Sequence, residues 1–171
     1  MGNLKKGRLV SNTGPIIALM LIGKLEILRE LFDEVVVPEE VHREVLQGKS
    51  ASFFNLMHVT LYERMDWIRI QTLSNPLEPS LKSLLDAGEA SVVQTAREMG
   101  TDYVLIDERK ARKIARSVYG LNVIGTARLL VEAKKNGLID SVADMIDKLR
   151  EGGYWIGDSI VQRMLKEAGE T

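Results

Sequence analysis

The sequence predicts an α/β fold built around a mainly parallel β-sheet. Short apolar runs alternate with helical patterns from one end of the chain to the other, which is typical of β-strand and helix units wound around such a sheet. At 171 residues, with 45% hydrophobic and 27% charged residues, the chain also has the length and composition of a soluble globular protein. We therefore expect a single domain over residues 1–171.

Five short apolar runs are the predicted strands, at residues 8–11, 34–37, 67–71, 103–106 and 122–124. Between the first two, residues 16–21 and 25–32 form two predicted helices broken at Gly23. Pro38 suits the first turn of the next helix, in which Val41 and Val45 lie one turn apart.

The second half of the chain is predicted to be largely helical around the last two strands. After a loop at residues 75–79, two helices carry buried stripes formed by Ala90, Val93 and Ala96 and by Ala111, Ala115 and Val118. Gly137 ends a helix that begins near Thr126, and Ser141 with Asp144 resembles the capped start of another. Gly152 and Gly153 precede a final short helix, so C-terminal helices are expected within residues 140–168.

Composition excludes several functions. The chain has no cysteine, which excludes a disulfide framework, a thiolate zinc site and a cysteine nucleophile, and fits a cytoplasmic location. The apolar stretch at residues 15–22 is too short to span a bilayer, so no membrane role is expected. With a net charge of −1, the chain lacks the basic surface of proteins that coat nucleic acid, and any such contact must be local.

Acidic and amide side chains follow the predicted strands or begin the helices between them. Asn12 follows the first strand, Glu44 lies two helical turns after the second, and Glu89 begins the helix before the fourth, which ends in Asp107 and Glu108. Right-handed crossovers bring such positions to one cleft at the carboxyl end of the sheet. Clustered carboxylates repel one another unless a cation neutralises them, and oxygen ligands suit Mg²⁺ or Mn²⁺. Such ions activate water for attack on phosphorus, so the pattern indicates nuclease chemistry.

Each of these residues also has a purely structural interpretation. Glu44 alone is typical of an exposed helix residue paired with a base such as Arg43. Glu89 alone would favour the dipole of its own helix. Asp107 and Glu108 together could cap the next helix, and Asn12 could be an ordinary turn residue.

The ordered set of motifs resembles the PIN-domain family, in particular its archaeal and bacterial branch. The matching segments run in order from residue 8 to about residue 137 and read VSNTGPIIAL (10–19), IGKL (22–25), VPEEVHREV (37–45), DAGEA (86–90), LIDER (105–109) and VIGT (123–126), the last leading into Ala133 and Lys134. The resemblance implies a three-layer α/β/α sandwich and Mg²⁺- or Mn²⁺-dependent cleavage of RNA. Many members are toxins held by an antitoxin protein, and dimers are common.

The resemblance also implies roles for individual residues. The four acidic positions of the family map to Asn12, Glu44, Glu89 and either Asp107 or Glu108, with the metal expected on Asn12, Glu89 and that last pair. Supporting roles fall to Thr13, Asp86 and Thr126. The first position is normally aspartate, and an amide is a weaker ligand for a hard cation. A catalytically weak module that binds RNA or a protein is therefore the alternative to an active ribonuclease.

A basic run follows the acidic pair, and three of its members, Arg109, Lys113 and Arg116, lie along one predicted helical face where RNA phosphates would pass. A solvated face is the alternative interpretation. His42 and His58 lack partners at metal-ligand spacing, and we interpret them as surface or packing residues. Trp67, Tyr154 and Trp155 are expected to serve the core or an interface rather than to stack on bases.

A nucleotide-binding or receiver-like α/β domain is the remaining alternative, because alternating strands and helices do not choose among such folds. The sequence has neither of the glycine-rich phosphate-binding loops. A receiver would also need a lysine where Gly125 and Thr126 stand.

Overall fold

The computed structural model describes residues 4–48 and 55–171, in which five parallel strands form one sheet. The strands are β1 (Arg8–Ser11), β2 (Glu34–Pro38), β3 (Ile68–Gln71), β4 (Tyr103–Leu105) and β5 (Val123–Ile124), in the spatial order β3-β2-β1-β4-β5. The α/β fold and the five strands are confirmed, with strand ends that differ from the predicted ones by at most one residue. Pro38 belongs to β2 and precedes the helix rather than lying in its first turn.

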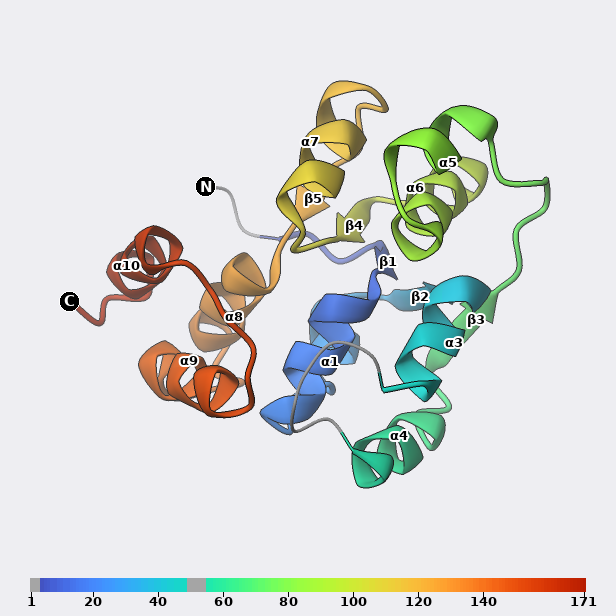
Figure 1. Ribbon diagram of the computed structural model, residues 1–171. Helices are drawn as coiled ribbons and strands as arrows, with labels where there is room; N and C mark the ends of the chain where they lie inside the picture. Colours follow the sequence, from blue (N-terminus) through green and yellow to red (C-terminus); the bar gives the residue numbers. More distant parts are fainter. Residues whose placement is uncertain (1–3, 49–54) are drawn as a thin grey trace.

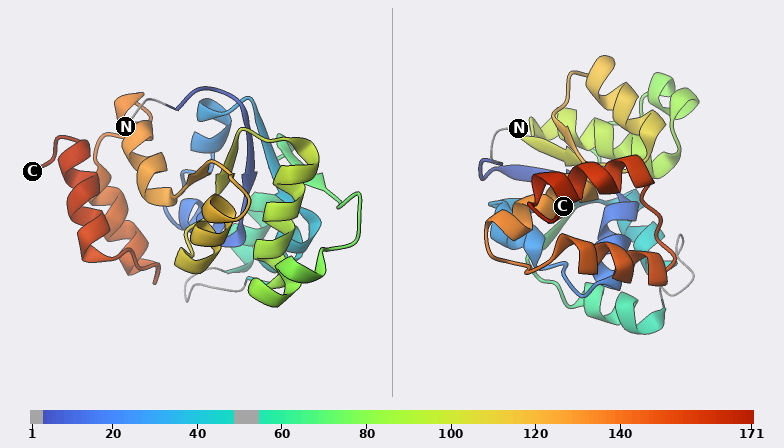
Figure 2. Two further views of the ribbon diagram at one scale, coloured as in Figure 1. Left: turned by 90° about the horizontal axis from the view of Figure 1, so that it is seen from above. Right: turned by 90° about the vertical axis from the view of Figure 1, so that its left-hand side faces the viewer.

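Helices cover both faces of the sheet. Those that the structure describes are α1 (Thr13–Leu21), α2 (Ile27–Leu31), α3 (Glu39–Leu46), α4 (Leu56–Glu63), α5 (Pro79–Leu84), α6 (Ala87–Met99), α7 (Arg109–Ser117), α8 (Thr126–Lys135), α9 (Val142–Glu151) and α10 (Asp158–Glu167). Helices α5, α6 and α7 lie on one side of the sheet and α1, α3 and α4 on the other (Figure 1). Helices α8, α9 and α10 pack together beside the β5 edge (Figure 2). The three-layer arrangement expected from the resemblance is present.

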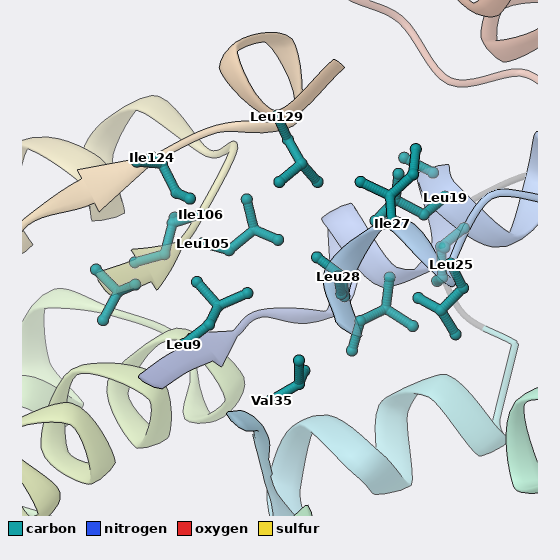
Figure 3. Close-up of a cluster of buried hydrophobic side chains, with 14 of the residues drawn as sticks. Leu9, Leu19, Leu25, Ile27, Leu28, Val35, Leu105, Ile106, Ile124 and Leu129 are labelled. Atoms are coloured by element: carbon teal, nitrogen blue, oxygen red, sulfur yellow. The ribbon is translucent and has the colours of Figure 1, made fainter. Parts of the chain in front are cut away.

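The core lies between the central strands and these helices. Leu9 on β1 is fully buried and pairs with Val35 on one side and Tyr103 on the other. Figure 3 shows how side chains from β1, β4 and β5 meet those from α1, α2 and α8, with Leu28 and Leu129 among them. The apolar runs of β1, β2, β4 and β5 are therefore largely buried on both faces, as in other parallel sheets, whereas the edge strand β3 exposes Ile70 to 41%.

Several helices differ from the sequence prediction. Helices α4 and α5 were not predicted, and Pro79 begins α5 rather than ending a loop. The stripe of Ala90, Val93 and Ala96 is buried as expected, but Val118 is 63% exposed because it lies at the end of α7. Gly137 ends α8 in a left-handed conformation with φ 71°, which glycine adopts without steric cost.

A carboxylate ties the three C-terminal helices together. Glu170, beyond the end of α10, accepts hydrogen bonds from the backbone N–H groups of Val142 and Ala143 at 2.6 and 2.9 Å and from Nζ of Lys134 at 2.8 Å. Val142 and Ala143 form the first turn of α9 and Lys134 the last turn of α8. Because the first N–H groups of a helix lack partners within it, Glu170 supplies the charged acceptor that α9 needs.

Candidate active site at the carboxyl end of the sheet

Strand β1 ends in a buried amide that does not cap the helix it precedes. The backbone N–H of Asn12 donates to the carbonyl of Leu105 at 2.9 Å, which continues the β1 and β4 pairing past the strand. Its side chain is at the N-cap of α1 but makes no capping hydrogen bond, and Asn12 is only 8% exposed. Among the residues that the structure describes, none is hydrogen-bonded to this amide, so its oxygen is available to a ligand.

Glu44 is held beside the start of α1 by a hydroxyl group. The hydroxyl of Thr13 donates to Oε2 of Glu44, which reaches across from α3. Gly88 in the first turn of α6 covers the same carboxylate so closely that a Cβ added there would lie 2.5 Å from Oε1. Three elements that are distant in sequence therefore meet at Glu44, and the close approach of α6 depends on glycine.

Glu89 takes part in the capping box of α6. Its backbone N–H donates to Oδ1 of Asp86 at 2.8 Å, and its carboxylate accepts from the backbone N–H of Asp86 at 3.2 Å. Burial and the neighbouring charge of Asp86 raise the pKa of Glu89, with a further contribution from Glu108, while the hydrogen bond from Asp86 opposes them. A half-buried carboxyl with a raised pKa is what a cation or a proton would neutralise.

Asp107 and Glu108 have different partners although they are adjacent in sequence. Glu108 is the N-cap of α7 and accepts from the N–H groups of Lys110 and Ala111 at 3.0 and 2.7 Å. Its structural interpretation as a helix cap is therefore confirmed.

Asp107 points instead toward β5 and the C-terminal segment. It accepts from the N–H and hydroxyl of Thr126 at 2.8 and 2.5 Å and from the hydroxyl of Tyr154. Burial, followed by the charge of Asp107 and this hydrogen bond, raises the pKa of Tyr154, so the phenol stays protonated and remains a donor. Tyr154 was not predicted to be part of the site. It is 47 residues from Asp107 in sequence, and no local motif links the two.

The predicted acidic positions lie around the carboxyl end of the sheet but do not form one compact cluster. Thr13 joins Asn12 to Glu44 on one side, and on the other a Cβ added to Gly14 would lie 3.3 Å from the hydroxyl of Tyr154, which binds Asp107. Within residues 4–48 and 55–171, no three acidic or histidine side chains form a group that could hold a metal ion. The donors are all oxygens, which suits a hard cation, but each carboxylate is turned to a protein donor.

The predicted basic face is only partly free. Arg109 and Lys113 are exposed on α7, whereas the guanidinium of Arg116 donates to the carbonyl of Val123 at 2.9 Å and that of Arg112 donates to the carbonyl of Ile106 at 2.6 Å. Arg116 is thus linked to β5 rather than to the outer face of α7.

The two histidines and Trp155 lie outside the candidate site. His42 is hydrogen-bonded to the hydroxyl of Tyr62 at 2.9 Å, and His58 completes the capping box of α4, so both have structural roles. Trp155 was expected to serve the core or an interface; it does not serve the core, because it is 69% exposed, and the interface role stays a prediction.

Comparison with known proteins decides the family. A family model described as a PIN domain matches residues 8–170. The chain belongs to the PIN-domain family. The match continues well past residue 137, where the motifs read from the sequence end, so α9 and α10 are part of the family's pattern. No protein with a curated description matches the sequence.

Membership in the PIN-domain family gives the chain a nuclease-type fold. In the described part of the chain, no helix is long and apolar enough to cross a membrane.

Proposed function

We propose that this PIN domain hydrolyses RNA phosphodiester bonds with the help of Mg²⁺ or Mn²⁺. The observation that carries the proposal is the set of oxygen donors around the carboxyl end of the sheet: the unbonded amide of Asn12 and the carboxylates of Glu44, Glu89 and Asp107. Bound there, the ion would supply a deprotonated water and stabilise the leaving oxygen. Asn12, Glu89 and Asp107 would hold it, and we assign Glu108 to helix capping.

The surrounding residues orient these donors. Thr13 fixes the carboxylate of Glu44, and Thr126 with Tyr154 fixes that of Asp107. Side chains held by such neighbours need little rearrangement when a ligand binds. Residues that do not touch the metal can therefore still raise metal affinity and activity, because they orient the side chains that do. Asp86 has the same relation to Glu89 through the capping box.

The alternative function is a catalytically weak module that binds RNA or a protein. It is favoured by one observation, the neutral amide of Asn12 at the position where the family normally has a carboxylate. A missing charge weakens the attraction for a hard cation, because carboxylates dominate the affinity of such sites.

A cleavage assay on mixed RNA with Mn²⁺ separates these functions. Glu89→Gln is the variant of choice because glutamine still accepts the capping-box hydrogen bond from Asp86 while removing the charge. Glu63→Gln, at an exposed position on α4, is the matched control. We expect wild type and the control to cleave, and Glu89→Gln to be at least about 100-fold slower.

Cleavage that survives a chelating agent and the Glu89→Gln change would refute the metal-dependent mechanism. RNA binding without any Mn²⁺-dependent cleavage by the wild type would establish the binding module instead.

We also propose cytoplasmic protein partners, either an antitoxin or a second copy of this chain. The proposal rests on two observations. Antitoxin partners and dimers are common in the family, and helix α4 exposes the apolar side chains of Leu56 and Met57 to 80% and 63%. Sedimentation of the wild type and of Leu56→Lys tests self-association: a dimer dissociated by the lysine supports the homodimer, and a monomeric wild type refutes it.

The toxin role predicts that induced expression stops growth only when the Glu89 carboxylate is intact.

A further inference from the structure

A pocket of about 460 Å³ lies between the β5 edge of the sheet and the C-terminal helices. Its walls come from α7, β5, α8 and α10 and from residues 154–157, and Asp107 contributes to it, so it adjoins the candidate active site. Its volume falls within the range of roughly 300–1,000 Å³ typical of small-molecule sites.

The pocket is locally basic although the whole chain has a net charge of −1. Its lining contains four arginines, Arg112, Arg116, Arg128 and Arg163, against two carboxylates, Asp107 and Glu167. Hydrogen bonds from Thr126 and Tyr154 hold Asp107 in position without cancelling its charge. Four arginines against two carboxylates still leave the lining with an excess of positive charge, which favours an anion.

Two of these arginines have no carboxylate partner. Among the ion pairs of the described residues none involves Arg112 or Arg116, and both guanidinium groups bind backbone carbonyls instead. They are one helical turn apart, and burial together with the charge of Arg116 lowers the pKa of Arg112, although the charge of Asp107 opposes this shift. Each guanidinium has five N–H donors, so both retain donors after binding one carbonyl. Two neighbouring guanidinium groups that form no ion pair can both donate to one phosphate, and such charge-assisted hydrogen bonds are stronger than neutral ones.

An aromatic ring completes the pocket. Trp155 lines it and is 69% exposed, and the guanidinium of Arg150 stacks 4.8 Å from the centre of the indole ring. Arg150 is in turn paired with Asp158 at 2.9 Å. A mostly exposed indole beside a basic pocket is the kind of arrangement on which nucleic-acid bases stack.

We propose that this pocket binds one nucleotide unit of single-stranded RNA, with the phosphate at Arg112, Arg116 and Arg163 and the base on Trp155. The natural ligand follows from the proposed ribonuclease function, since the pocket adjoins Asp107. The pocket would hold the nucleotide next to the cleaved one and so set the position of the strand. The binding itself needs neither metal nor cleavage.

Tryptophan fluorescence tests the proposal in the full chain. Trp67→Phe leaves Trp155 as the reporter, and a chelating agent keeps cleavage out of the measurement. We expect a short single-stranded RNA and AMP to quench Trp155, and inorganic phosphate to compete with both. Arg163→Gln, an exposed position on α10, should weaken RNA binding about tenfold. Lys166→Gln is the matched control, because Lys166 is exposed on the same helix outside the pocket.

Trp155→Ala separates the two parts of the site. It should weaken AMP binding by about tenfold, as expected for the loss of one stacking contact. The affinity for inorganic phosphate, measured by calorimetry, should stay unchanged. RNA binding that survives in a chain unable to cleave with Mn²⁺ would support this inference and refute the proposed function.

Four results would overturn the inference. The first is no quenching by RNA or AMP at millimolar concentration. The second is an equal loss of RNA binding for Arg163→Gln and Lys166→Gln. The third is binding of AMP that RNA does not displace. The fourth is Trp155 emission that changes with protein concentration alone, which would assign the pocket to an interface between two copies of the chain.

Discussion

Lowering the pH should release Glu170 from the start of α9 and loosen the C-terminal helices. Its side chain is 13% exposed. Burial acts to raise the pKa of Glu170, but the hydrogen bonds from Lys134, Ala143 and Val142 outweigh it and lower the pKa from 4.5 to about 2. The native state therefore binds this proton more weakly than the unfolded chain, so the stabilisation is fully present above pH 4.5 and is lost as the pH falls through about 2.

The magnitude follows from that change in proton affinity. Each tenfold change in affinity corresponds to about 1.4 kcal/mol, so the lowering from 4.5 to about 2 is equivalent to about 3 kcal/mol at low salt. This is a large share of the roughly 5–15 kcal/mol that stabilises a typical domain. Salt should reduce the figure, because the ion pair with Lys134 is partly open to solvent.

Urea unfolding of wild type and Glu170→Gln from neutral pH to about pH 2 measures the effect. Glu151→Gln, at an exposed position at the end of α9, controls for the loss of a charge. We expect Glu170→Gln to be less stable than wild type by about 2–3 kcal/mol at neutral pH, and the two proteins to converge in acid. A difference below about 0.5 kcal/mol at neutral pH, or one that persists unchanged in acid, would refute the reasoning.

Three further substitutions probe the site. Asn12→Asp adds a carboxylate close to Glu44, so it should tighten Mn²⁺ binding in calorimetry, speed RNA cleavage and lower the melting temperature without metal. Gly88→Ala should displace the flexible carboxylate of Glu44 rather than the backbone of α6, so cleavage falls while the stability in urea changes by less than about 1 kcal/mol. Tyr154→Phe removes a donor to Asp107 and should cost about 1.5–3 kcal/mol in urea unfolding.

Each substitution has an outcome that contradicts its premise. If Asn12→Asp changes neither metal affinity, cleavage nor metal-free stability, Asn12 is not at a metal site. Unaltered cleavage by Gly88→Ala would mean that the position of Glu44 is unimportant. A Tyr154→Phe protein as stable as wild type would show that the hydroxyl of Tyr154 contributes nothing to holding Asp107.

The strands were predictable because a buried parallel strand leaves a continuous apolar run. The fourth strand was predicted to end at Ile106 and ends at Leu105. The N–H of Ile106 still donates to the carbonyl of Ile124 at 3.0 Å, so the pairing of β4 with β5 continues one residue past the strand. Helix α4 was missed because Leu56 and Leu61 are exposed and give no buried stripe. Its available signal was the capping box formed by Asn55 and His58.

The sequence predicted the site less completely than it predicted the fold. Strand-end placement indicated Asp107 and Glu108 together, but the direction of each side chain depends on contacts that lie far away in sequence. Glu108 turns to the helix that follows it, and Asp107 turns to Thr126 and Tyr154. The pocket around Trp155 was missed for the same reason, since its walls come from four elements and no motif joins them.

The central position of β1 shapes how the chain folds during synthesis. β2 and β3 follow β1 in order and can pair as they emerge, but the other edge of β1 waits for β4, whose Tyr103 pairs with Leu9 across 94 residues. At about 5–20 residues per second, a nascent chain needs roughly 5–20 s to cover that distance. Throughout this interval Leu9 and Val10 present an open apolar strand edge, the kind of edge that recruits other chains. The exposure ends when β4, which follows α6 in the chain, pairs with β1. Substitutions that slow the folding of α6 should therefore increase aggregation of the nascent chain more than they destabilise the completed fold.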